Sequence, residues 1–308
     1  MKEAHELNRF RAVMRLMPVL ALVAVLMAGA AGCSPSTEPS NDGEISGSFN
    51  IIGSNTVTPL STMWAEAFMT AHPKVNIAIS GPGSGAGIAA LIDSTTDICQ
   101  SSRGIKSSEV DQAKAKGVTP HEIVVARDGL AVVVNPANPV SQLTIAQLSA
   151  IYTGQVTNWK EVGGSDAPIV ALARDTNSGT HVFFKEHVVQ MDGLPTKDTK
   201  LEYGSRVLFL PSTEAGVTET AKNVNAIFYP GLGYVTTEIK LLAVKKTEAD
   251  PAVTPSIETV LDGTYPVARP LLYYTNGAPA GLIQTFIDYC LSAEGQAIVE
   301  ASGYVPVN

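Results

Sequence analysis

The sequence predicts an α/β protein of about two domains. Its 308 residues fit the usual 100–200 residues per domain. With 45% hydrophobic and only 16% charged residues, the composition is typical of a folded chain rather than a disordered one. A strand-like run, a loop rich in Gly, Ser and Thr, and a helix-like run also follow one another repeatedly. This alternation is typical of α/β sheets.

Residues 1–32 predict the signal peptide of a lipoprotein. Four basic residues precede the apolar run 16–31, which is shorter than the roughly 20 residues of a membrane span. Small residues then lead to Cys33, which we expect to be the first mature residue and to carry a palmitate-containing lipid anchor on the extracytoplasmic side of the cell membrane. An uncleaved anchor is the alternative, and Met14 is an alternative start.

Residues 33–48 are rich in Ser, Pro, Gly, Asn and Asp, which predicts a flexible tether. Without residues 1–32 the chain keeps 17 basic against 27 acidic residues and has no basic run, which argues against a nucleic-acid partner. The net negative charge of the chain repels anions, so an anionic ligand would need hydrogen-bond donors placed directly around it.

Two further cysteines, Cys99 and Cys290, lie in apolar stretches and are expected to be buried thiols. A disulfide between them is the alternative in an exported protein. No Cys and His spacing is typical of a metal site, and we expect neither a metal nor a cofactor.

Three donor-rich loops follow strand-like runs in the first part of the folded body. Thr56 precedes an apolar-periodic helix ended by Pro73, Ser84 lies in a glycine-rich loop before another helix, and Ser102-Arg103 follows the strand-like run 96–99. The glycine spacing fits neither a dinucleotide fingerprint nor a P-loop, and Pro82 excludes a hydrolase elbow. Each loop alone is equally typical of an ordinary turn. Together they predict an anion site at the carboxyl ends of strands.

A fourth loop joins the strand-like run 168–173 to a helix with apolar residues at 182–189. Ser178 is placed as its N-cap. A helix start exposes unpaired N–H groups and the positive end of the dipole, and Arg174 adds a fork of donors suited to an oxyanion. An ordinary capped helix beside a surface Arg is the alternative.

The remaining pattern predicts where the chain passes between domains. Arg127-Asp128-Gly129 separates two strand-like runs, so the first crossing is expected near residue 128, and the return near 235–243. The other expected elements are helices over 107–116, 214–224, 256–261 and 282–299, and strands over 124–126, 130–134 and 271–274.

Residues 143–164, with Thr157-Asn158-Trp159 leading to Val162-Gly163-Gly164, resemble the phosphate-binding proteins of high-affinity phosphate ABC transporters. The resemblance runs from Phe49 to Asn308. It includes Gly53-Ser54-Asn55-Thr56-Val57, Gly83-Ser84-Gly85, Arg174 with Ser178-Gly179-Thr180, and Gly303-Tyr304-Val305-Pro306. It implies a two-lobed type II periplasmic-binding-protein clamp with the ligand in the interlobe cleft and two hinge crossings. Lobe 1 would comprise 49–127 and 236–308, and lobe 2 would comprise 128–235.

The resemblance also implies a set of phosphate donors. They are Thr56, the Val57 N–H, Ser84, Ser102, Arg103, Arg174, Ser178, the Gly179 N–H and Thr180, with Ser54 as a weaker candidate. Two positions depart from the family. Better-known members have an Asp acceptor at Arg103, which leaves discrimination against sulfate open, and a carboxylate at Thr176 that steadies the Arg. Asp175 is expected to take over that second role.

The resemblance implies a monomeric solute-binding lipoprotein that captures inorganic phosphate by hinge closure and delivers it to a membrane permease and its ATPase. It implies no enzymatic activity. Three alternatives remain open at this point. One is binding of sulfate, molybdate or tungstate, another is a hydrolase or phosphatase with Ser84 or Ser178 as nucleophile and His181 as base, and the third is a signalling or scaffold lipoprotein.

Overall fold

A computed structural model describes residues 45–307. The predicted signal peptide, the lipidation of Cys33 and the tether up to residue 44 lie outside these residues. In the part that is described, none of the helices combines the length and the apolar character that crossing a membrane requires.

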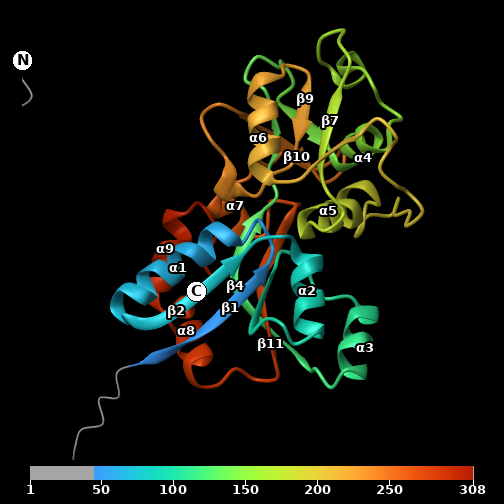
Figure 1. The fold of residues 1–308 in the computed structure, drawn as a ribbon. Helices are drawn as coiled ribbons and strands as arrows, with labels where there is room; N and C mark the ends of the chain where they lie inside the picture. Colours follow the sequence, from blue (N-terminus) through green and yellow to red (C-terminus); the bar gives the residue numbers. More distant parts are fainter. Residues whose placement is uncertain (1–44, 308) are drawn as a thin grey trace, which may run out of the picture. The chain divides into compact units, whose positions relative to one another are not determined.

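Two β-sheets organise the described chain, and we name the two lobes after them (Figure 1). Lobe 1 contains a five-stranded sheet of order β2-β1-β3-β11-β4, and lobe 2 a six-stranded sheet of order β6-β10-β5-β9-β7-β8. The strands of lobe 1 are β1 (Ser46–Gly53), β2 (Lys74–Ser80), β3 (Ile98–Ser101), β4 (Pro120–Gly129) and β11 (Ala268–Asn276). Those of lobe 2 are β5 (Val132–Val134), β6 (Gln142–Thr144), β7 (Val170–Arg174), β8 (Leu208–Leu210), β9 (Ala226–Phe228) and β10 (Lys240–Lys245).

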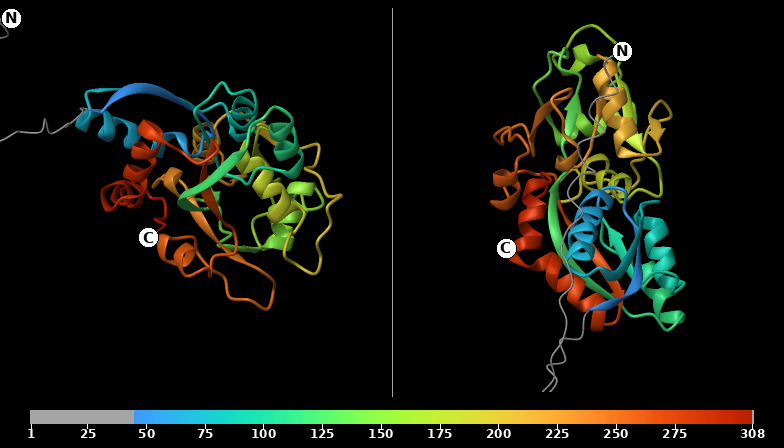
Figure 2. Two further views of the ribbon diagram at one scale, coloured as in Figure 1. Left: turned by 90° about the horizontal axis from the view of Figure 1, so that it is seen from below. Right: turned by 60° about the vertical axis from the view of Figure 1, so that its left-hand side comes forward.

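Helices cover both faces of the lobe 1 sheet, as the views of Figures 1 and 2 agree. Alternate residues of β11 show the two faces, because Leu271 and Tyr273 pack in one core cluster and Leu272 and Tyr274 in another. The first cluster takes side chains from α1 (Thr58–Ala71), α8 (Gly281–Leu291) and α9 (Ala293–Ala301). The second takes them from α2 (Ser84–Ile92) and α3 (Ser107–Ala115).

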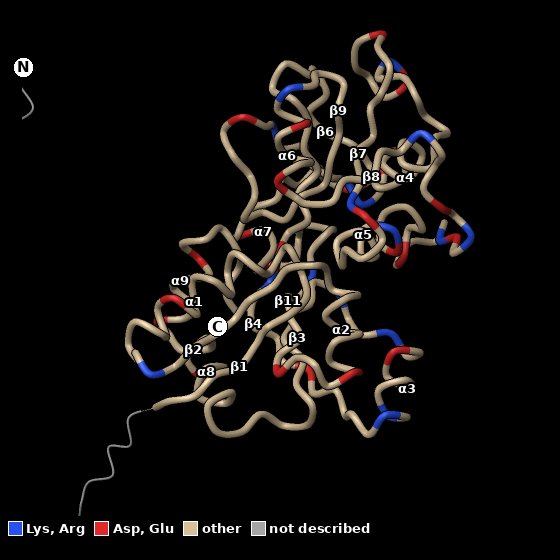
Figure 3. The backbone as a smooth tube through the Cα atoms, in the orientation of Figure 1, with Lys and Arg blue, Asp and Glu red and all other residues tan. Residues whose placement is uncertain are grey.

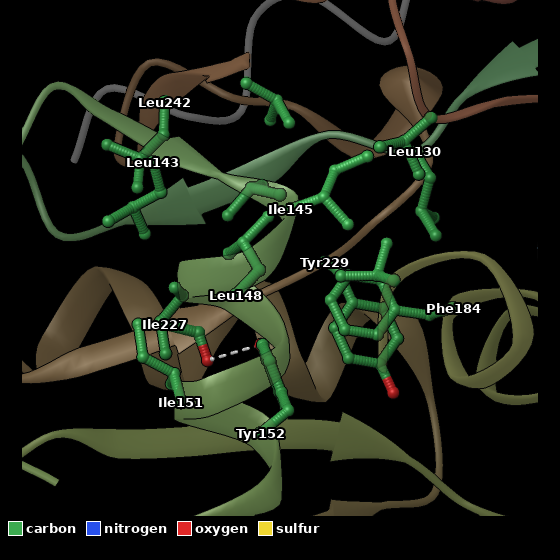
Figure 4. Packing of buried hydrophobic residues seen from close by; sticks show 14 of the residues in the cluster. Leu130, Leu143, Ile145, Leu148, Ile151, Tyr152, Phe184, Ile227, Tyr229 and Leu242 are labelled. Carbon is green, nitrogen blue, oxygen red and sulfur yellow. Dashed lines mark hydrogen bonds between the residues drawn. The ribbon is translucent and has the colours of Figure 1, made fainter. Parts of the chain in front are cut away.

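Lobe 2 is layered in the same way. Its larger core holds α4 (Ile145–Thr153), α5 (Gly179–Phe184) and the π-helical turn Lys185–Val189 against the sheet, and α6 (Thr213–Lys222) packs on the other face. Figure 4 shows Phe184 stacked on Tyr229, with ring centroids 3.7 Å apart, and Tyr152 beside them with its hydroxyl donating to the Ile227 carbonyl. Two short 3₁₀ turns, Trp159–Val162 and Leu232–Tyr234, complete the lobe.

The chain leaves the lobe 1 sheet between β4 and β5, and the expected return to lobe 1 does not lie at 235–243. This part of the prediction is wrong, because β10 pairs with β5 and β6 and buries Leu242 and Val244 in lobe 2. The chain reaches lobe 1 again only with β11, after α7 (Ile257–Leu261). Val260 of α7 also packs in the lobe 2 core.

Three further boundaries differ from the prediction. β1 begins at Ser46, inside the predicted tether 33–48 and before the expected start of lobe 1 at residue 49. Ser46–Ser48 pair through their backbone with β2 and need no apolar side chains. Arg127-Asp128-Gly129 continues β4 instead of separating two strands, since β11 pairs with it up to Gly129. The predicted helix 282–299 is two helices, because Ser292 caps α9 by accepting a hydrogen bond from Gly295 N.

Acidic and basic residues are interspersed along the chain in both lobes (Figure 3).

Candidate functional site

Parallel strands in both sheets deliver the candidate residues to one edge of each lobe. In lobe 1, β1 is parallel to β2 and β3, and the segments after these strands carry Thr56, Ser84 and Ser102. In lobe 2, β7 is parallel to β8 and β9, and Arg174 ends β7 directly before the Ser178 loop. The carboxyl ends of parallel strands are where open α/β sheets place ligands.

Hydroxyl groups from the two lobes are in direct contact. Thr56 Oγ1 lies 2.9 Å from Thr180 Oγ1, which joins the loop after β1 to the start of α5. Within lobe 1, Ser84 Oγ lies 3.3 Å from Ser102 Oγ and accepts a hydrogen bond from Ser102 N at 3.1 Å. All four side chains are buried. The structure therefore brings four of the predicted residues into one hydroxyl-rich cluster.

Gly179 is where the start of α5 meets lobe 1 most closely. A Cβ at this position would lie 2.3 Å from Ser84 Oγ and 2.5 Å from Ser102 Oγ, so no side chain fits. Gly85, the residue after Ser84, also donates from its backbone N to the Asn177 carbonyl at 3.1 Å. The lobes thus touch through backbone and hydroxyl groups, which requires glycine at 179.

Ser178 caps α5 as predicted, its Oγ accepting a hydrogen bond from His181 N at 3.4 Å. The backbone N–H groups of Gly179 and Thr180 precede the first intrahelical donor and have no acceptor within the helix. They lie at the positive end of the helix dipole. This end of the helix faces the Thr56 and Ser84 hydroxyls and can bind an anionic group.

Arg174 is buried and held by neutral groups. Its Nη1 donates to Asn55 Oδ1 at 3.1 Å and to Thr213 Oγ1 at 2.5 Å, and its Nη2 donates to the Pro211 carbonyl at 3.1 Å. Its Nε is buried and has no hydrogen-bond partner among residues 45–307. Burial lowers the pKa of Arg174, against the smaller opposite effect of Asp175, yet an Arg stays charged near neutral pH.

Asp175 contributes less to Arg174 than expected. Its Oδ2 lies 3.9 Å from Arg174 Nη2, at the limit of an ion pair, and its side chain is 36% exposed. Water screens such a contact. The steadying role expected of a carboxylate therefore belongs mainly to Asn55, Thr213 and the Pro211 carbonyl, none of which carries a charge.

Arg103 is engaged away from the hydroxyl cluster. Its Nη1 and Nη2 form a two-pronged ion pair with Glu109 of α3 at 2.8 and 2.7 Å, and Nη1 also donates to the Gly104 carbonyl. Burial raises the pKa of Glu109, but the bonds from Arg103 and Lys106 N outweigh this and leave it below its ordinary value. Arg103 thus fixes the end of the Ser102 loop, although its buried Nε has no partner in the described part.

The backbone N–H of Val57 is hydrogen-bonded to Ser54 in the loop after β1. Val57 N donates to the Ser54 carbonyl at 3.2 Å and to Ser54 Oγ at 3.4 Å. The Val57 N–H that the resemblance assigns to the ligand is therefore used inside its own turn in this structure.

Sequence reasoning missed a buried ion pair behind the cluster. Arg269 of β11 donates from Nε and Nη2 to Asp128 Oδ2 at 3.1 and 2.8 Å, and its Nη1 donates to the Ser102 carbonyl at 3.3 Å. Asp128 also accepts from Leu232 N at 3.0 Å. The Arg269 guanidinium lies 5.6 Å from the Phe183 ring of α5. The charged Asp128 at the predicted crossing was a signal, but its partner is 141 residues away.

The serines are not paired with a histidine base. The His181 ring bonds through Nδ1 to the Arg174 carbonyl at 2.8 Å and packs on Tyr203. Within residues 45–307, no ring nitrogen of histidine bonds to Ser84 or Ser178, and no group of three His, Cys, Asp or Glu side chains could hold a metal. Cys99 and Cys290 are both buried free thiols, in separate core clusters.

Known proteins are similar to this chain over most of its length. Residues 36–294 match the PBP superfamily domain. The chain is 31% identical to the phosphate-binding protein PstS of Pseudomonas aeruginosa over 95% of this chain and 94% of that one, and 30% identical to PstS of Bacillus subtilis over 96% and 93%.

Solved structures are similar as well. One from Clostridium perfringens, assigned as a phosphate ABC transporter substrate-binding protein and solved with bound phosphate, has a TM-score of 0.71 and 36% identity, covering 85% of this chain and all of that one. An ABC-type phosphate transport receptor from Vibrio cholerae has a TM-score of 0.67 and 30% identity, covering 83% and 99%.

Proposed function

Because the chain belongs to the PstS family of phosphate-binding proteins within the PBP superfamily, we propose that it is the substrate-binding component of a phosphate ABC transporter. Its two α/β lobes form the type II periplasmic-binding-protein clamp. One observation supports the assignment most strongly. Hydroxyls of lobe 1 meet the start of α5 of lobe 2, where Thr56 touches Thr180 and Ser84 and Ser102 touch Gly179.

We propose that phosphate is bound where these groups meet. Hydroxyl and backbone N–H donors satisfy the oxygens of a dehydrated anion without adding a competing counter-charge. Arg174 would supply the positive charge, since its Nε has no partner in the described part and its other nitrogens bond to neutral acceptors. Closure of the lobes then depends on the anion, because only the closed arrangement brings donors from both sides together.

The proposed donors are Thr56, Ser84, Ser102, Arg174, Ser178, Gly179 and Thr180. Val57 and Arg103 are weaker candidates for phosphate donors. In this structure the Val57 N–H is bonded to the Ser54 carbonyl, and the Arg103 guanidinium is bonded to Glu109.

We propose binding without covalent chemistry. A serine nucleophile requires an adjacent base. Ser84 bonds to Ser102, and the ring of His181 bonds to the Arg174 carbonyl rather than to Ser178. A clamp that releases its ligand unchanged to a permease and its ATPase needs no such base. A lipid anchor at Cys33 would keep the protein beside that permease on the extracytoplasmic side.

Calorimetric titration of the phosphate-depleted full chain in detergent tests the proposal. We expect tight phosphate binding that excess sulfate does not displace, and loss of that binding in Arg174→Ala. Position 103 is Arg rather than the Asp acceptor of better-known members, so the comparison of phosphate with sulfate is the most informative part of the experiment. Equal binding of both anions would reassign the protein as a general oxyanion receptor, and binding of neither would contradict the proposal.

A further inference from the structure

Two Gly-Tyr pairs from opposite lobes meet beside the turn that carries Thr56. Gly233-Tyr234 belongs to a 3₁₀ turn of lobe 2, and Gly303-Tyr304 follows α9 of lobe 1. A Cβ at Gly233 would lie 2.6 Å from Cζ of Tyr304, and a Cβ at Gly303 would lie 3.4 Å from Cα of Gly233. The two pairs are therefore in direct contact, and neither belongs to the proposed set of phosphate donors.

The hydroxyl of each tyrosine donates to a backbone carbonyl of the same turn. Tyr234 OH donates to the Asn55 carbonyl at 2.8 Å, and Tyr304 OH donates to the Thr56 carbonyl at 2.6 Å. Burial raises the pKa of both hydroxyls, so both keep the proton that they donate. Only 1% of Tyr304 is exposed, which shields its bond from water. The peptide groups on both sides of Thr56 are thus each held by a tyrosine.

Holding these two peptide groups fixes the donors of Thr56. Its Cα joins the two planar groups, so their orientations together set the direction of its side chain. The Thr56 hydroxyl lies 2.9 Å from the Thr180 hydroxyl of lobe 2. In a trans peptide the N–H points opposite to the carbonyl, so the N–H groups of Thr56 and Val57 point away from the tyrosines. A bond accepted by the carbonyl also polarises the peptide and strengthens its N–H as a donor.

The backbone around each tyrosine is fixed independently of this turn. Arg127 N donates to the Val305 carbonyl at 2.7 Å, and Val305 N donates to the Arg127 carbonyl at 3.0 Å, which ties the tail after Tyr304 to β4. Leu232 N donates to Asp128 Oδ1 at 3.0 Å, which ties the 3₁₀ turn to the same strand. Tyrosines anchored in this way can orient the turn rather than follow it.

We propose that Tyr234 and Tyr304 are positioning residues for phosphate binding, which hold the turn so that the Thr56 hydroxyl and the adjacent N–H groups are aimed at the anion. The inference rests on the proposed function, because it concerns the same anion site. Tyr304 acts within lobe 1, in the open and the closed protein alike. Tyr234 acts across the lobes, and its bond to Asn55 forms on closure.

Phenylalanine variants remove the two hydroxyls and keep the rings. In Tyr304→Phe and in Tyr234→Phe we expect phosphate affinity to fall about two- to tenfold, the net range for one hydrogen bond, and further in the double variant. Tyr152→Phe is the matched control, because it removes a buried hydroxyl that donates to the Leu172 and Ile227 carbonyls in the lobe 2 core. It should lower stability but bind phosphate like wild type. Calorimetry on the phosphate-depleted full chain measures all four.

Isotope labels report the two peptide groups directly. Asn55-Thr56 is the only Asn–Thr pair of the sequence, so ¹³C-carbonyl Asn with ¹⁵N-Thr gives a single carbonyl–amide NMR peak. Thr56-Val57 and Thr259-Val260 are the only Thr–Val pairs, so the second provides an internal control when Thr and Val are labelled. A carbonyl that loses its hydrogen bond depolarises its peptide, which should shift both labelled nuclei upfield. We expect the Thr56-Val57 peak to shift in Tyr304→Phe and the Asn55-Thr56 peak in Tyr234→Phe.

A merely structural role would lower the unfolding temperature, as in the control, without changing phosphate affinity. Wild-type affinity in both single variants, or labelled peaks at their wild-type positions in both, would overturn the inference. Thermal unfolding identifies a variant that does not fold, and the less buried Tyr234 keeps the test open if Tyr304→Phe fails. If wild type itself does not bind phosphate, the proposed function fails, and the labelled peaks still test whether the tyrosines orient the turn.

Discussion

Arg174 shows how single residues prepare this site for an anion. A charge that is buried without a counter-ion is costly, and it is normally paired. Here the guanidinium is held by an amide, a hydroxyl and a carbonyl, and its Nε has no partner among residues 45–307. These neutral groups stabilise the position of Arg174, and its one ion-pair partner among the described residues, Asp175, approaches only to 3.9 Å and is partly exposed. An incoming dianion would compensate the charge of Arg174.

The hydroxyl of Thr56 can be tested by removing its oxygen alone. Thr56→Val keeps the branched shape but loses the contact with Thr180 Oγ1 and a donor to the anion. We expect phosphate binding to weaken by about 1.5–3 kcal/mol, the value for a hydrogen bond to a charged group. Calorimetry measures it, with Thr70→Val on the exposed side of α1 as the matched control. Unchanged affinity in Thr56→Val would remove Thr56 from the site.

His181 predicts a pH dependence of stability. Burial lowers its pKa below the ordinary 6.5, against the opposite effect of its bond to the Arg174 carbonyl. The unfolded chain therefore takes up a proton below about pH 6.5 before the folded protein does, so this residue's contribution to stability is present above that pH and is lost as the pH falls.

Urea unfolding between pH 5 and 7 measures this effect. His181→Asn keeps a donor near the Arg174 carbonyl but cannot titrate, and we expect it to flatten the fall in unfolding free energy, by up to about 1.4 kcal/mol per pH unit. His121→Asn, at an exposed position of β4, is the control. Identical pH profiles for wild type and His181→Asn would show that His181 does not carry the dependence.

Among the elements, the start of α5 matters most, because it brings the second lobe to the first. Ser178 caps the helix, Gly179 contacts Ser84 and Ser102, and Thr180 contacts Thr56. Consecutive residues therefore supply the cap, the close approach and the hydroxyl. A substitution that preserves α5 but adds a side chain at its contact with Ser84 and Ser102 should keep the lobes apart.

Gly179→Ala makes that change. Alanine favours a helix, so local stability should be maintained, but the new Cβ would lie 2.3 Å from Ser84 Oγ. Overpacking of this kind costs about 1–3 kcal/mol, and we expect this cost to appear as a loss of phosphate affinity of about ten- to hundredfold. Calorimetry with Gly104→Ala as control, where nothing lies within 4 Å, measures it. Wild-type affinity in Gly179→Ala would contradict closure at this contact.

The elements also show what could be predicted from sequence. The strand–loop–helix units around Thr56, Ser84 and Arg174 are local, and hydrophobic period, capping and glycine content predict them well. The membership of β10 in lobe 2 was missed because its apolar alternation suits either sheet and only its partners β5 and β6 decide. Asn55 and Arg269 were missed for the same reason, since their partners lie more than 100 residues away.

At the scale of the whole molecule, the Asp128–Arg269 pair joins the strands that leave and re-enter lobe 1. Both side chains are fully buried, on β4 and β11. Leu232 N of lobe 2 and the Ser102 carbonyl of lobe 1 complete the network. The pair therefore links both crossings to the loop that carries Ser102. We therefore expect the Asp128–Arg269 pair to stay in place when the lobes move about β4 and β11.

Removing one partner should be far worse than removing both. Arg269→Met leaves a buried carboxylate unpaired, and such losses cost about 3–5 kcal/mol. Asp128→Leu with Arg269→Met removes both charges and should recover a large part of that loss. Urea unfolding of the two single variants and the double variant measures the coupling. Strict additivity would show that the pair does not act as a unit.

The most direct test of the account is a crystal structure of the protein grown with phosphate. We predict one phosphate between the lobes, with oxygens bonded to Thr56, Ser84, Ser178, the N–H groups of Gly179 and Thr180, and Arg174. Asn55 should remain on the guanidinium as its neutral acceptor. Phosphate bound away from the meeting point of Thr56 and α5, or no phosphate at saturating concentration, would contradict the account.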